Sequence, residues 1–152
     1  MGQPETEKTR ILLVDDEVVV LEVQAEILRR LGYGVAASKD SLEAFDLFKE
    51  SPYGFDLVIA DEIMPRLRGT ELAARIRDIR PDVPVIILTA GLDLVGTQER
   101  AEALRINDVF LKPVDRSGIA AAIETLLRQR REEETRCDCS AAPCFTPELE
   151  PA

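Results

Sequence analysis

Five polar residues in this chain each follow a short apolar run, and their side chains could together carry out phosphoryl chemistry. Three of them are carboxylates, one is a hydroxyl and one is an ammonium. In chain order, with the run that each follows in parentheses, they are Asp15 and Asp16 (11–14), Asp61 (57–60), Thr89 (85–88) and Lys112 (109–111). They are far apart in sequence, so only the fold could bring them together.

Each of these residue types has a role in such chemistry. Carboxylates that share one crevice repel each other unless a cation is present, and oxygen ligands favour Mg²⁺. A carboxylate can also act as a nucleophile and form an aspartyl phosphate. The metal and Lys112 would offset the charge of the phosphoryl group, and the Thr89 hydroxyl would bind one of its oxygens. Each residue alone also has a structural explanation, since Asp15 and Asp16 could simply cap a helix.

The elements that must position these residues can be predicted from the hydrophobic pattern. The apolar runs are too short for typical helices and contain Val and Ile, which favours buried strands. Amphipathic stretches separate them, which indicates an α/β fold with a parallel sheet and helices on both faces. The predicted strands are 11–14, 34–38, 57–60, 85–88 and 108–111, and the predicted helices are 17–31, 41–50, 70–80, 97–104 and 116–131. The carboxyl ends of such strands share one edge of the sheet, where ligands bind.

Length and composition indicate one domain with polar ends. The 152 residues fit a single domain at 10–131. Residues 1–9 and an acidic tail at 132–152, which contains Cys137, Cys139 and Cys144, are expected to be disordered. The net charge of −10 argues against direct nucleic-acid binding. The chain has no histidine, which excludes His-dependent catalysis by its own residues. It has no apolar run of membrane-spanning length and no signal-peptide core, so we expect a cytoplasmic location without membrane contact.

Four motifs give the chain a resemblance to a known family. They are ILLVDDE (11–17), DLVIADEIMP with Gly69 (56–69), VIILTA (85–90) and FLKPV (110–114). Residues 10–131 resemble the receiver domains of bacterial two-component response regulators, including the receivers attached to hybrid histidine kinases. The resemblance implies a flavodoxin-like (βα)₅ sheet with strand order 2-1-3-4-5, and it implies that Asp61 is the phosphoacceptor. Asp16, Asp61 and the Ile63 carbonyl would bind Mg²⁺ directly, Asp15 would act mainly through a metal-bound water, and Thr89 and Lys112 would contact the phosphoryl group.

The same resemblance implies a signalling role and a set of partners. A sensor histidine kinase or a histidine phosphotransfer protein would donate the phosphoryl group in a two-component pathway or phosphorelay. The surface formed by 97–104, 108–111 and 116–131 would then switch and act on an unidentified downstream protein, and it is also the surface through which a homodimer would form. The chain would be a switch that assists its own phosphorylation and hydrolysis rather than a turnover enzyme. Val109 replaces an aromatic residue common in the family, so we expect the loop 90–96 and the following helix to carry the signal.

Two other functions fit part of the pattern. A phosphatase of the haloacid-dehalogenase type also uses an aspartate at a strand end together with Mg²⁺. That chemistry needs a second acid two residues after the nucleophile, where this chain has Ile63. A receiver-like docking module that is never phosphorylated is the other alternative, and the intact acids, Thr89 and Lys112 argue against it.

Overall fold

A parallel sheet of five strands forms the centre of the domain in the computed structural model, which describes residues 9–90, 94–106, 108–112 and 115–141. The strands are β1 (Arg10–Val14), β2 (Gly34–Ser38), β3 (Leu57–Asp61), β4 (Val85–Thr89) and β5 (Asp108–Leu111). Their order in the sheet is β2-β1-β3-β4-β5, and all neighbouring pairs are parallel. The predicted flavodoxin-like fold, strand order and approximate strand positions are therefore confirmed.

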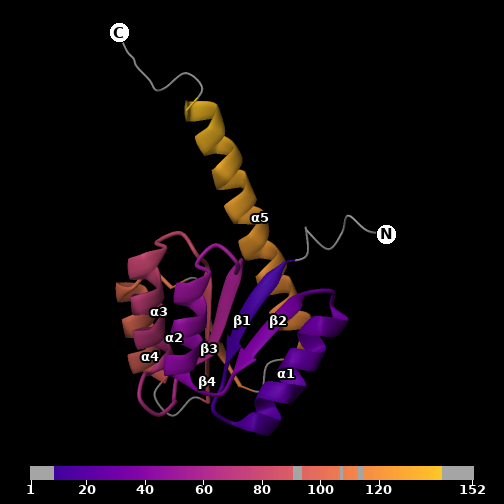
Figure 1. The fold of residues 1–152 in the computed structure, drawn as a ribbon, viewed down its shortest axis with the longest axis vertical. Coiled ribbons are helices and arrows are strands. Elements are labelled where there is room, and N and C mark those ends of the chain that lie inside the picture. Colours follow the sequence, from indigo (N-terminus) through magenta and orange to yellow (C-terminus); the bar gives the residue numbers. More distant parts are fainter. Residues whose placement is uncertain (1–8, 91–93, 107, 113–114, 142–152) are drawn as a thin grey trace.

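Five helices cover the two faces of the sheet. They are α1 (Val18–Arg30), α2 (Ser41–Glu50), α3 (Gly69–Ile79), α4 (Leu94–Ala103) and α5 (Arg116–Ala141). Figure 1 shows α2, α3 and α4 on one side of the sheet and α1 and α5 on the other. Asp40 caps α2, because its side chain accepts a hydrogen bond of 2.8 Å from the Leu42 N–H. α4 begins three residues before its predicted start at Thr97.

Alternating side chains of the strands fill two separate cores. Leu12 and its equivalents pack beneath α2 and α3, whereas Leu13 and its equivalents pack beneath α1 and α5. This alternation follows from the two-residue period of a strand. Val109 packs against the first core and Phe110 against the second, so Phe110 does not replace the missing aromatic side chain at position 109.

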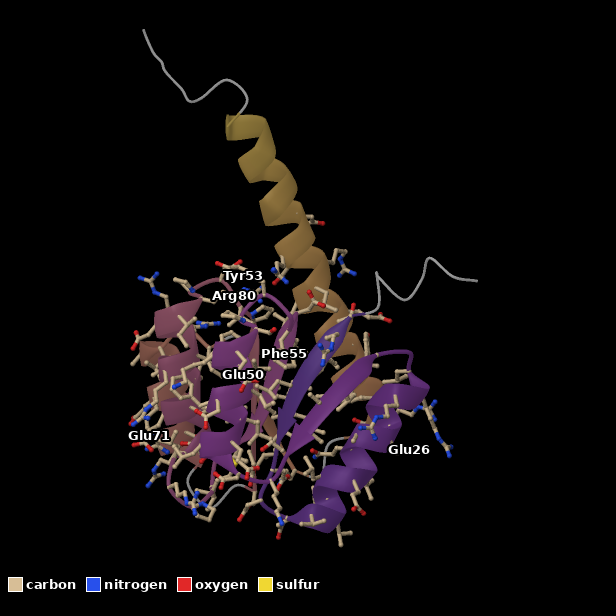
Figure 2. All side chains as sticks on the ribbon, in the orientation of Figure 1. Glu26, Glu50, Tyr53, Phe55, Glu71 and Arg80 are labelled. Carbon is tan, nitrogen blue, oxygen red and sulfur yellow. The ribbon has the colours of Figure 1, made fainter. Side chains whose placement is uncertain are left out.

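A buried arginine fixes the edge of the sheet at which β3 and β4 begin. Arg80 is 1% exposed, and its guanidinium donates hydrogen bonds to the carbonyls of Pro52 and Phe55. The same guanidinium lies 5.0 Å from the centre of the Tyr53 ring. Figure 2 shows Tyr53, Arg80 and Phe55 close together at the end of the domain from which α5 projects. This cluster therefore lies at the opposite edge of the sheet from Asp61, the last residue of β3.

The expected disorder of the whole tail from residue 132 is wrong, because α5 continues to Ala141. The expected boundary at 131 relied on the end of the apolar period. Residues 128–134 consist of arginine, glutamine and glutamate, which are strong helix formers but leave no apolar period. Residues 142–152, with Cys144, and residues 1–8 lie outside the described part of the chain. Thr9 is already placed beside the sheet, since its carbonyl accepts a hydrogen bond from the Gly34 N–H. Among the described helices, none combines the length and apolar character needed to cross a membrane.

Candidate functional site

The carboxyl ends of β1 and β3 bring the predicted acids together. Asp61 ends β3 and is 6% exposed, and Asp15 directly follows β1 and is fully buried. One Asp15 oxygen accepts a hydrogen bond of 3.0 Å from the Glu17 N–H, so Asp15 also orders the chain just before α1. Oxygen atoms of Asp15, Asp16 and Asp61 all lie within 4.8 Å of one another. The site is therefore a compact cluster of three carboxylates.

Lys112 joins two of these carboxylates. Its ammonium lies 2.9 Å from an Asp15 oxygen and 3.2 Å from an Asp61 oxygen. The Lys112 backbone N–H donates to the Thr89 carbonyl at 2.7 Å, so the end of β4 fixes the point from which this lysine extends. Thr89 is fully buried, one residue beyond Leu88, which pairs with Asp61 across the sheet. Thr89 and the Lys112 ammonium thus lie at the same edge of the sheet as the acids.

Burial and neighbouring charge shift the pKa of two groups in the site. Burial raises the pKa of Asp61 to about 6, from an ordinary value of 3.8. Lys112 opposes that rise, whereas the charges of Asp15 and Asp16 add to it. Burial alone would lower the pKa of Lys112, but its hydrogen bond with Asp15 and the charge of Asp61 raise the pKa overall. A bound cation would relieve the repulsion that the three carboxylates exert on one another.

The donor set suits a hard divalent cation. Three carboxylates with no nitrogen or sulfur ligand among them are typical of Mg²⁺ or Ca²⁺ sites. Asp16, the least buried of the three, leaves the cluster open to solvent on one side. Ile63 lies in the loop after β3, and the binding of a metal by its carbonyl stays a prediction.

Glu62 is a further site residue, which sequence reasoning missed. Its carboxylate is fully buried and accepts hydrogen bonds from the Thr70 N–H at 2.8 Å and the Thr70 hydroxyl at 3.0 Å. It also accepts two hydrogen bonds from Arg100 on α4. Glu62, the residue directly after Asp61, thus connects the end of β3 to the first turn of α3 and to α4. A second acid directly after Asp61, between apolar residues on both sides, is a possible signal, but nothing in the sequence identifies its partners.

Gly69 is required where α3 begins beside the acceptor strand. A Cβ atom at this position would lie 2.5 Å from the carbonyl oxygen of Asp61. The Gly69 N–H also donates to the Glu62 carbonyl at 3.1 Å. Any larger residue would therefore push directly on the backbone of Asp61.

Comparison with known proteins agrees with this architecture. The chain belongs to the response regulator receiver domain family, which it matches over residues 11–124, and is thus a receiver domain of two-component signalling. It is 34% identical over 125 residues to the response regulator MprA of Mycobacterium sp. (strain KMS), covering 82% of this chain and 53% of MprA. It is 33% identical over 119 residues to the transcription factor SKN7 of Chaetomium thermophilum, covering 74% of this chain and 15% of SKN7. The chain therefore spans about half, or less, of the length of these relatives.

Solved structures show the same fold. A response regulator receiver domain protein from Clostridium thermocellum superposes with a TM-score of 0.77 at 29% identity, covering 81% of this chain and 97% of that one. A protein described as an adenylate cyclase from Rhodopirellula baltica gives a TM-score of 0.80 at 27% identity, covering 90% of this chain and 99% of that one.

Proposed function

We propose that this chain accepts a phosphoryl group on Asp61 in the presence of Mg²⁺ and thereby switches a signalling surface. The observation that carries the proposal is the shared contact of the Lys112 ammonium with Asp15 and Asp61, beside a cluster of three carboxylates. A carboxylate at the end of a buried strand is held rigidly, and its solvent-facing side can attack the phosphorus atom of a donor. Mg²⁺ held by Asp15, Asp16 and Asp61 would neutralise charge on the transferring group.

The transfer itself needs few protein groups. An Asp61 oxygen forms a bond to phosphorus while the bond between phosphorus and the donor nitrogen breaks, and the electron pair remains on that nitrogen. The 152 residues contain no histidine, so the donor histidine would lie outside them, as it would in a histidine kinase or phosphotransfer protein. Lys112 is already placed to offset the charge on the phosphoryl oxygens, and the Thr89 hydroxyl would donate a hydrogen bond to one of them. Hydrolysis of the aspartyl phosphate would reset the switch, and in this proposal the chain would act as a switch rather than as a turnover enzyme.

An apolar groove beside the site suits a helix of that donor. Val19, Val20 and Val23 of α1 line it together with Lys112. Val19 is 73% exposed and Val23 is 54% exposed, which leaves apolar surface without cover next to the phosphoacceptor. Val19→Ser should therefore slow transfer from a protein donor but leave labelling by a small phosphodonor unchanged. Equal rates with the protein donor would contradict this docking surface.

Phosphorylation would be read out through α4. The added charge beside Thr89 and Lys112 would draw Thr89 toward the phosphoryl group. The chain between Thr89 and α4 is short, so α4 would move with it. Val109 has no large ring to change position, which leaves the displacement of α4 as the carrier of the signal.

The proposal is tested with acetyl phosphate, a donor that needs no protein partner. Wild-type protein with Mg²⁺ should gain one phosphoryl group in an intact-mass measurement, and chelation of the metal should prevent the gain. Asp61→Asn should remain unlabelled. Labelling of that variant to the wild-type extent would remove the assignment of Asp61.

A further inference from the structure

Glu62 is buried and holds α4 through Arg100. The Nη2 and Nε atoms of Arg100 lie 2.7 Å and 3.1 Å from the Oε2 atom of Glu62. Among the described side chains of α4 only Thr97 and Ala101 are buried, and Arg77 of α3 donates hydrogen bonds to the Leu104 and Arg105 carbonyls just after the helix. A displacement of α4 that carries the Arg100 side chain away from Glu62 would break this ion pair.

A second arginine is positioned beside the same carboxylate oxygen. The Nη1 atom of Arg68 lies 3.9 Å from the Oε2 atom of Glu62, a long ion pair that is beyond hydrogen-bonding distance. Arg68 directly precedes α3, and its backbone N–H donates to Glu71 at 2.9 Å, so its backbone is fixed while its side chain is 45% exposed. Because Arg68 belongs to the start of α3, its ion pair with Glu62 could shorten to a hydrogen bond without any movement of α4.

We propose that Glu62 exchanges Arg100 for Arg68 when Asp61 is phosphorylated and that this exchange allows α4 to move. The inference rests on the proposed function, because it requires a phosphorylated or mimicked state at Asp61. A fully buried carboxylate that loses its cation carries a large desolvation penalty. Because Arg68 would then pair with Glu62, the carboxylate would keep a cation after Arg100 is released. The resting and displaced positions of α4 would therefore differ little in free energy. The Thr70 hydrogen bonds keep the carboxylate in place throughout.

The exchange gives two arginines opposite effects on activation. Removal of Arg100 destabilises the resting position of α4, so ligands that favour the displaced position should bind more tightly. Removal of Arg68 destabilises the displaced position, so the same ligands should bind more weakly. Each variant also loses one positive charge near the same carboxylate. A purely electrostatic effect on an anion bound at Asp61 would therefore weaken binding in both variants.

The test uses beryllofluoride with Mg²⁺, a mimic of the phosphoryl group. Its affinity for the full chain is measured by fluorine NMR titration in wild-type protein, Arg100→Gln and Arg68→Gln. Arg30→Gln is the control, because it also removes one positive charge. Arg30 pairs with Glu26 on the exposed face of α1, away from Glu62. We expect the affinity to rise at least fivefold in Arg100→Gln, to fall at least fivefold in Arg68→Gln and to stay within twofold in the control.

Affinities that fall in both variants, or that stay unchanged in both, would overturn the exchange. Failure of beryllofluoride to bind wild-type protein would instead contradict the proposed function, and the exchange with it. If Arg100→Gln does not fold, wild-type protein still decides the matter through the Nε–H resonance of Arg100. That proton should be protected in the free protein and lose its protection on addition of beryllofluoride, whereas unchanged protection would refute the proposal.

Discussion

The raised pKa of Asp61 makes the metal-free protein lose stability as the pH rises. The folded protein binds a proton at Asp61 with a pKa of about 6, whereas the ordinary value is 3.8. The resulting stabilisation is fully present below pH 3.8 and is lost as the pH rises through about 6. The difference between the two pKa values corresponds to about 3 kcal/mol, at 1.36 kcal/mol per pKa unit.

Comparison with Asp61→Asn isolates this effect, because asparagine does not titrate. Urea unfolding with a chelator present gives the free energy of unfolding of both proteins between about pH 4 and pH 7. We expect the advantage of Asp61→Asn over wild type to grow by about 2 kcal/mol across this interval, because part of the shift is already lost at pH 4 and part remains at pH 7. Saturating Mg²⁺ should reduce that growth, since the cation favours the ionised carboxylate. An advantage that does not depend on pH would show that Asp61 is not held in a desolvated, repulsive site.

Three further substitutions test the site and its supports. Asp16→Asn should weaken Mg²⁺ binding at least tenfold, about 1.4 kcal/mol, without loss of folding stability, because Asp16 adds repulsion to the cluster. Calorimetric titration measures the Mg²⁺ affinity, and an unchanged affinity would exclude Asp16 as a ligand. Gly69→Ala should cost about 1–3 kcal/mol in urea unfolding and slow labelling by acetyl phosphate, because its Cβ would press on Asp61; wild-type stability would refute the close approach. Arg105 has a φ of 59°, so Arg105→Gly should raise the free energy of unfolding by about 1 kcal/mol, and a fall would contradict the inferred strain.

The sequence predicts the strand-end site well because its signals are local. Asp15, Asp61 and Lys112 each end an apolar run, and a parallel sheet places such ends on one edge. The fold class and strand order came from the alternation of runs and from the family motifs. These signals depend only on neighbouring residues and on the topology, so the three side chains meet as expected.

The supporting contacts could not be predicted in the same way. Glu62 and Arg100 are 38 residues apart, and neither lies in a periodic pattern that identifies its partner. The extension of α5 to Ala141 was also missed, because charged helix formers leave no apolar period to follow. Contacts of this kind depend on side-chain packing in three dimensions, which hydrophobic patterns do not encode.

The central claim is that Asp61 itself carries the phosphoryl group, and chemical trapping tests it most directly. Protein treated with acetyl phosphate and Mg²⁺ is reduced with borohydride, which converts an aspartyl phosphate into homoserine, and its peptides are then sequenced by mass spectrometry. We predict homoserine at position 61 alone, and none when Mg²⁺ is withheld. Homoserine at Asp15 or Asp16 with Asp61 unchanged would contradict the account of the site.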